Sequence, residues 1–227
     1  MSKIYRRLVS LLFLLIMLIS VAGSIIVTKN TEKAFLIYLD PGHGGSDGGA
    51  VANNDIMEKD IVLEVSFFLK DYLENAGFLV KMTRYGDYDL APTYSKNRKR
   101  DDIYKRCSLI NNTNCLLYIS IHANKFPDKN VHGAQVFYNN QCLESKRLSE
   151  TIQEMISAIT QNTNRVAKSI NGKYLIEHVK KIGCLVEIGF LSNLQELELL
   201  IKESYQKKMA YAIYAGIISF LEGKNKI

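Results

Sequence analysis

Residues 37–50 read Ile-Tyr-Leu-Asp-Pro-Gly-His-Gly-Gly-Ser-Asp-Gly-Gly-Ala, an apolar extended run that leads into a loop with five glycines around one histidine. Glycine is favoured where the backbone takes a positive φ or comes close to another group. A strand that ends in a glycine-rich loop is how α/β proteins build a site at the carboxyl edge of a sheet. The stretch therefore predicts an α/β fold in which His43 is a metal ligand at that edge.

The rest of the chain alternates between strand and helix patterns, which is typical of a mainly parallel sheet covered by helices. The sequence predicts strands at 34–39, 78–82, 115–121, 134–138, 174–176 and 184–188. Apolar residues at helical spacing predict helices at 58–75, 98–112, 143–160, 194–201 and 205–221. No linker or repeat interrupts this pattern, so we expect a single domain over residues 31–227.

Residues 1–30 have the pattern of a targeting segment. Three basic residues precede an uncharged, apolar run over residues 8–27. About 20 apolar residues can span a bilayer as a helix, and basic residues before such a helix stay in the cytoplasm. The triplet Ser20-Val21-Ala22 fits a signal-peptidase site, whereas the continuing apolar run fits a retained membrane anchor. The sequence leaves both alternatives open, and both place the remaining chain outside the cytoplasm.

The composition is that of an ordinary globular protein. Of 227 residues, 47% are hydrophobic and 23% are charged, which is enough for one sizeable core. The net charge of +6 comes partly from the basic start of the chain, and the mild remaining excess does not argue for nucleic-acid binding. The four cysteines show no Cys-x-x-Cys pairing, which argues against a cysteine zinc site. Buried thiols are favoured for Cys107, Cys115 and Cys184, and a disulfide stays open for all four, Cys142 included.

Three further residues are expected to converge on His43. His122 follows the strand predicted at 115–121, Glu187 lies in the strand predicted at 184–188, and Glu58 opens the first helix. The carboxyl ends of central parallel strands meet at one edge of the sheet. Two imidazoles and one carboxylate with an open fourth position form the ligand set of a hydrolytic zinc site. A second carboxylate that is not a ligand is then available as general base and acid.

Each of these residues also has a structural explanation. A lone histidine is more often hydrogen-bonded within the protein than bound to a metal, and Glu58 would complement the dipole of its helix. Glu187 is harder to explain in this way, because an unpaired carboxylate in the apolar run Cys184-Leu-Val-Glu-Ile188 would be costly to bury. Burial also raises a carboxyl pKa toward the range that suits proton transfer, which favours a functional Glu187.

Four motifs then give the chain a resemblance to a known family. They are Leu39-Asp-Pro-Gly-His-Gly-Gly45, Glu58, Ser120-Ile-His-Ala-Asn124 and Val186-Glu-Ile-Gly-Phe-Leu-Ser-Asn193, in this order. Together they resemble the zinc-dependent N-acetylmuramoyl-L-alanine amidases of the third amidase family, over roughly residues 36–221. The resemblance implies a twisted, mostly parallel six-stranded sheet flanked by helices. It also implies one zinc ion held by His43, Glu58 and His122, with Glu187 as the catalytic carboxylate.

The resemblance further implies the substrate. This is peptidoglycan, cut between the lactyl group of N-acetylmuramic acid and the L-alanine of the stem peptide. Arg84 and Arg106 match arginines that are common in the family; we expect Arg84 to contact substrate, whereas a structural role fits Arg106 better. Asn124 and His132 are further candidates for substrate contact, although a surface histidine at the start of a strand is the simpler explanation for His132.

An apolar N-terminal segment followed by a catalytic domain without wall-binding repeats is similar to the spore-cortex amidases of endospore-forming bacteria. Those enzymes prepare muramic acid for a separate deacetylase, and the two steps form muramic-δ-lactam in the cortex between the forespore membranes. We therefore expect peptidoglycan as the substrate, with an activating or localising protein and a downstream muramic acid deacetylase as partners. The alternatives are a vegetative autolysin or cell-separation amidase, a non-catalytic peptidoglycan-binding regulator, and a zinc peptidase.

Overall fold

The computed structural model describes residues 11–13, 35–52 and 55–224. The chain divides into two compact units, Met1–Ala34 and Phe35–Ile227. Apart from residues 11–13, the expected signal or anchor segment lies outside the described residues. No helix in the described ranges is both long and apolar enough to cross a membrane.

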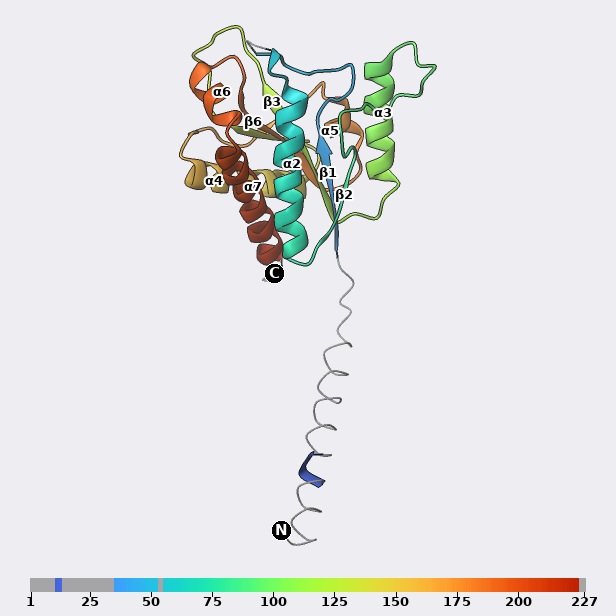
Figure 1. Ribbon diagram of the computed structural model, residues 1–227, viewed down its shortest axis with the longest axis vertical. Helices are drawn as coiled ribbons and strands as arrows, with labels where there is room; N and C mark the ends of the chain where they lie inside the picture. The colour runs from blue at the N-terminus through green and yellow to red at the C-terminus, as the bar shows by residue number, and fades with distance from the viewer. Residues whose placement is uncertain (1–10, 14–34, 53–54, 225–227) are drawn as a thin grey trace. The chain divides into compact units, whose positions relative to one another are not determined.

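Six strands of the second unit form one sheet, in the order β2-β1-β3-β6-β4-β5 (Figure 1). They are β1 (Leu36–Pro41), β2 (Leu79–Met82), β3 (Leu117–Asn124), β4 (Gln135–Tyr138), β5 (Lys168–Ser169) and β6 (Gly183–Phe190). Neighbouring strands run parallel, except for β4 and β6, which are antiparallel. The expected α/β class and the mostly parallel six-stranded sheet are confirmed.

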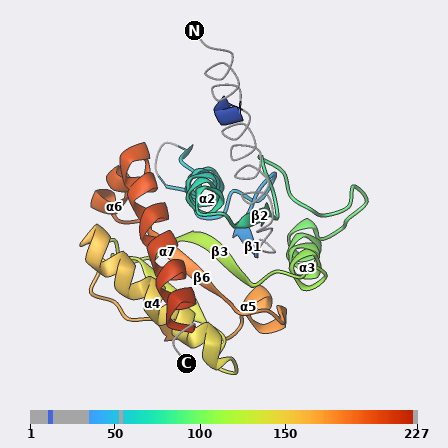
Figure 2. The same cartoon turned by 90° about the horizontal axis from the view of Figure 1, so that it is seen from below.

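Helices cover both faces of this sheet. They are α2 (Glu58–Asn75), α3 (Arg98–Asn111), α4 (Leu143–Thr160), α5 (Tyr174–His178), α6 (Leu194–Leu200) and α7 (Glu203–Lys224). In both views, α2, α4 and α7 lie on one side of the sheet, and α3 and α5 lie on the other (Figures 1 and 2). The bounds of α2 and α4 are those that the apolar spacing predicts.

Strand alternation decides which side chains face which layer, because successive residues of a strand point to opposite faces. In β3, Ile119 and Ile121 join the large core under α2, α4 and α7, whereas Tyr118 joins the smaller core under α3 and α5. In β6, Val186 belongs to the large core and Leu185 to the smaller one. The residues of β3 and β6 that follow Tyr118 and Leu185 at every second position, up to the carboxyl edge, therefore face the layer of α3 and α5.

The prediction of a strand at residues 174–176 is wrong. This segment is the first part of α5, and the sixth strand is the two-residue β5. The rings of Tyr174 and His178, four residues apart, stack with centroids 3.9 Å apart. Leu175 and Ile176 are both buried in the smaller core, so this run needs two adjacent side chains on the same side, which a strand does not provide.

Helices α4 and α7 pack closely where Gly216 meets Ile152. A Cβ atom at position 216 would lie 2.5 Å from the Cα of Ile152. Since that neighbour is backbone, the contact could be relieved only by moving one helix away from the other. The close approach of these helices therefore depends on a residue without a side chain.

Gly216→Ala is expected to lower the free energy of unfolding by about 1–3 kcal/mol, the usual cost of overpacking a core. Gly223→Ala is the matched control in the same helix, because a Cβ there meets no atom within 4 Å. The control should be neutral or stabilising by up to about 1 kcal/mol, since alanine has the higher helix propensity. Urea denaturation of both variants provides the measurement. Equal stability of the two variants would contradict the close packing of α4 against α7.

Candidate active site

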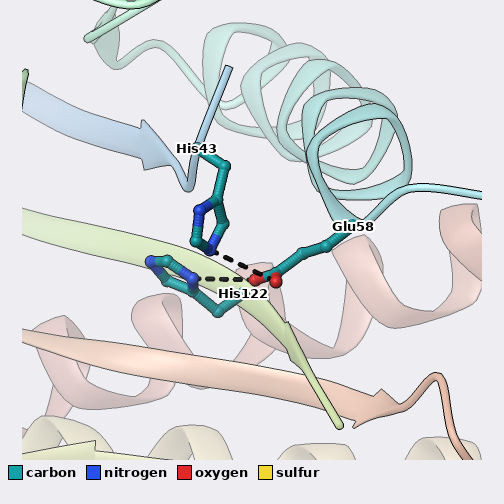
Figure 3. A group of neighbouring side chains, drawn as sticks. All are labelled: His43, Glu58 and His122. Atoms are coloured by element: carbon teal, nitrogen blue, oxygen red, sulfur yellow. Dashed lines mark hydrogen bonds and ion pairs between the residues drawn. The ribbon is translucent and has the colours of Figure 1, made fainter. Parts of the chain in front are cut away.

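The loop after β1 holds His43 in an unusual backbone conformation and a defined ring orientation. His43 has a φ of 60°, which is uncommon for a residue other than glycine. Its Nδ1 lies 2.8 Å from an oxygen of Asp47, four residues further on in the same loop. The other ring nitrogen, Nε2, lies 3.2 Å from Glu58 Oε2 (Figure 3). Asp47 therefore orients the imidazole and leaves Nε2 for a ligand.

Glu58, the first residue of α2, ties the loop and β3 together. The residue is only 4% exposed. Oε1 lies 2.8 Å from Nδ1 of His122 and accepts a hydrogen bond from the backbone N–H of Ala123, while Oε2 accepts one from the N–H of Ala50. Burial alone would raise the pKa of Glu58, but the hydrogen bonds from His122 and His43 outweigh it and hold the pKa well below its usual range. The carboxylate is therefore kept ionised.

Two glycines make room for these side chains. Gly49 has a φ of +70°, and a Cβ there would lie 2.5 Å from Glu58 Oε2 and 2.7 Å from Cδ2 of His43. A Cβ on Gly42 would lie 2.3 Å from the ring of His122. The glycine-rich loop is thus a close-fitting backbone support for the histidines and the carboxylate.

His43, Glu58 and His122 form a cluster that could hold a metal ion. One ligand atom from each lies within 4.8 Å of the others, and the two imidazole rings meet edge to face with centroids 5.0 Å apart. Two imidazoles and one carboxylate fit the protein ligand set of a catalytic zinc site with a free fourth position. Asp47 supplies the kind of outer carboxylate that orients a ligating histidine. The sequence expected these residues to converge, and their role as zinc ligands stays a prediction.

Glu187 lies directly beside this cluster. In the sheet register it stands opposite His122 of β3 on one side and Gln135 of β4 on the other. It is 7% exposed, and its Oε2 is the one buried side-chain oxygen or nitrogen in the described ranges that has no hydrogen-bond partner. Burial raises the pKa of Glu187, and the charge of Glu58 raises it further, against the opposing effect of His122. A buried oxygen left without a partner is costly in structural terms, which favours a role in proton transfer.

Arg106 of α3 anchors the loop that carries His43. It is 1% exposed, it forms ion pairs with Asp40 at 2.9 Å and Asp102 at 2.7 Å, and it donates hydrogen bonds to the carbonyl oxygens of Pro41 and His43. The structural role expected of Arg106 fits these contacts. Sequence reasoning missed the buried ion pairs of Arg106. Asp40 follows an apolar strand and Asp102 lies in a charged run, and neither pattern identifies Arg106 as the partner.

Arg84 is not placed to contact a substrate. Its side chain is fully buried, and its guanidinium donates hydrogen bonds to the backbone carbonyl oxygens of Pro41, Gly42, Lys59 and Gly86. The expected substrate contact is therefore corrected: Arg84 joins the loop after β1 to the start of α2. Sequence alone could not show that its guanidinium turns inward to meet carbonyl groups of three separate segments.

The side chains of Asn124 and His132 form hydrogen bonds within their own segments. Asn124 ends β3 half-buried, and its side-chain oxygen accepts a hydrogen bond from the N–H of Lys125. His132 is exposed, with Nδ1 2.8 Å from the carbonyl oxygen of Asn130, which agrees with a surface role before β4. Neither residue lines the cavity that opens beside His43 and His122. Substrate contact by these two residues stays a prediction without support from the cavity.

A profile of the family described as N-acetylmuramoyl-L-alanine amidase matches residues 37–219. In sequence, the chain is 47% identical over 192 residues to the germination-specific N-acetylmuramoyl-L-alanine amidase of Bacillus subtilis (strain 168). That alignment covers 83% of this chain and 81% of the relative.

Solved structures give the same result. The CwlD amidase from Clostridioides difficile, solved in complex with the GerS lipoprotein, superposes with a TM-score of 0.80 at 36% identity, covering 83% of this chain and 99% of that one. The N-acetylmuramoyl-L-alanine amidase from Clostridium difficile 630 superposes with a TM-score of 0.77 at 27% identity, covering 85% and 100%. The chain therefore belongs to the N-acetylmuramoyl-L-alanine amidase family.

Proposed function

We propose that this protein uses zinc to hydrolyse the amide bond between N-acetylmuramic acid and the L-alanine of the peptidoglycan stem peptide, as a step in spore-cortex maturation. The observation that carries the proposal is the cluster of His43, Glu58 and His122 with the unpartnered Glu187 beside it, in a member of this amidase family. The catalytic domain of the proposal spans residues 31–227.

His43, Glu58 and His122 are the proposed ligands of one zinc ion. Bound there, zinc would polarise the amide carbonyl and lower the pKa of a water molecule toward neutrality, which would make that water a nucleophile near neutral pH. The ionised Glu58 supplies the negative charge of the ligand set, and Asp47 holds the imidazole of His43 in place.

Glu187 is the proposed general base and acid. Its free oxygen accepts a proton from the attacking water as the new C–O bond forms. The same carboxyl group then passes that proton to the alanine nitrogen as the C–N bond breaks. The products are the muramic acid carboxylate and a stem peptide with a free amino terminus, so no other reactant is needed.

The spore-cortex role draws on the 47% identity to a germination-specific amidase. The products then feed a muramic acid deacetylase, and the two reactions make muramic-δ-lactam outside the cytoplasm. Since the similar CwlD amidase was solved with a lipoprotein, we include a lipoprotein partner that activates or localises this enzyme. The N-terminal segment is the proposed signal or membrane anchor.

Other functions have less support. A vegetative autolysin or cell-separation amidase would use the same site, but the relative named above favours germination. A non-catalytic regulator has no need to retain the complete cluster and a buried, unpartnered Glu187. A zinc peptidase would share the ligand types, and the family match argues against it.

Glu187→Gln is expected to lower the rate of stem-peptide release by at least about 100-fold, because general acid–base catalysis contributes roughly 10²–10⁴ to a rate. Zinc content should stay at that of the unchanged protein. Thermal stability should be equal or higher, because the substitution removes a buried charge beside an oxygen that has no hydrogen-bond partner. Muropeptide digests analysed by mass, metal analysis and thermal unfolding provide the three readouts.

Glu150→Gln on the exposed part of α4 is the control and should behave as the unchanged protein in all three. Undiminished hydrolysis by Glu187→Gln would remove Glu187 from the mechanism. Loss of zinc together with activity would show instead that Glu187 acts through metal binding.

Deleting the gene in its spore-forming host is expected to remove muramic-δ-lactam from the cortex, because the deacetylase would lack its substrate. Restoring the intact gene should return the lactam, and restoring the Glu187→Gln version should not. The measurement is a muropeptide profile of purified spores. Spores that keep their lactam while vegetative walls lose amidase products would favour the autolysin instead.

A further inference from the structure

A cavity of about 450 Å³ opens beside His43 and His122, between the layer of α3 and the segment that leads into α5. Its floor is the sheet, where Ser120 and Leu185 face it. Ile103 and Leu175 add apolar surface to its two walls.

Lys173 differs from the other cations that line this cavity. Lys99 forms an ion pair with Asp47, and Arg100 forms one with Asp101. Arg106 is held by its two buried carboxylates. The ammonium of Lys173 has no ion pair or hydrogen bond among the described residues, and the side chain is exposed.

Lys173 shares its cavity with the proposed catalytic centre. Lys173 lines the same cavity as two of the proposed zinc ligands, His43 and His122. Its ammonium makes no contact with the cluster of His43, Glu58 and His122 among the described residues. An anionic group bound to Lys173 would lie a short way from the bond that is cut.

Ring contacts hold the start of α5, next to Lys173, against α3. This residue is the N-cap of α5. The ring of Tyr174, the next residue, lies 4.6 Å from that of Tyr104 in α3, and it also stacks on His178 within α5. The lysine is thus carried by a wall that is packed against α3.

The chemistry of the stem peptide supplies a matching anion. The residue that follows L-alanine is a D-glutamate joined through its γ-carboxyl, which leaves its α-carboxylate free, a few bonds from the scissile amide. In some walls this group is amidated and uncharged.

We propose that Lys173 determines specificity by binding this α-carboxylate, so that the enzyme prefers stems with D-isoglutamate over stems with D-isoglutamine. This inference rests on the proposed amidase function. Lys173 touches no reacting atom, and its effect is on the binding of substrate.

The test compares disaccharide tetrapeptides that differ only in this carboxylate or carboxamide, with the full-length protein loaded with zinc. The unchanged enzyme is expected to show a KM about fivefold lower for the acid, as suits a solvent-exposed ion pair, with similar kcat for both. Lys173→Met should raise KM for the acid to that for the amide. Lys173→Arg should keep the preference, and Lys180→Met, an exposed lysine outside the cavity, should leave it unchanged.

Equal KM values for acid and amide in the unchanged enzyme, or a preference that survives in Lys173→Met, would overturn the proposal. A disaccharide dipeptide ending at D-isoglutamate should show the same preference; its loss would assign Lys173 to a carboxylate further along the stem and would also overturn it. Failure to cleave either substrate would count against the amidase function instead. In that case, calorimetric titration with the two free tetrapeptides decides the inference, with tighter binding of the acid expected only when Lys173 is present.

Discussion

The rest of the site depends on the contacts that the Glu58 carboxylate makes with two histidines and the backbone. It meets the ring of His43 from the loop after β1 and that of His122 from β3, and it accepts backbone hydrogen bonds from both segments. The backbone N–H of Glu58 also donates to the carbonyl oxygen of Ala50, so the loop is attached to the start of α2 by main chain as well as side chain. The loop after β1, the start of α2 and the distant strand β3 are held together by one buried charge, and each must be placed accurately for that charge to be satisfied.

Arg106 and Asp40 form a buried ion pair that supports the same loop. Ser120 and Thr83 donate hydrogen bonds to Asp40, and the guanidinium of Arg106 holds the pKa of this carboxyl below its usual range against the effect of burial. Buried ion pairs are costly to desolvate and are a weak source of stability. The role of this ion pair is to position the loop. Because Arg106 also binds carbonyl oxygens of the loop, it fixes the direction in which the chain leaves β1 at His43.

Much of the fold follows from sequence patterns. Helices α2 and α4 were predictable to the residue because each has a long apolar stripe, and Glu187 stood out because an acid in an apolar strand is hard to explain otherwise. Helix α5 was not predictable, since five residues are too short to show a period and the ring of Tyr174 packs against Tyr104 of α3.

The supporting residues of the site carry weaker signals. Asp47 lies in a polar loop, and Lys173 is one of many exposed lysines, so only the fold reveals what each of them faces. For Arg84 the expected substrate contact failed because its partners are backbone carbonyls, which no side-chain pattern records. Sequence thus identifies the residues of the cluster and Glu187 better than those that hold them in place.

The most direct measurement is anomalous diffraction at the zinc absorption edge from crystals of the protein grown without chelator. We predict one strong peak per chain, about 2.0–2.2 Å from a ring nitrogen of His43, a ring nitrogen of His122 and an oxygen of Glu58. Glu187 should stay outside the coordination sphere. A chain without a peak after zinc is supplied, or a peak that excludes any of the three ligands, would contradict the account.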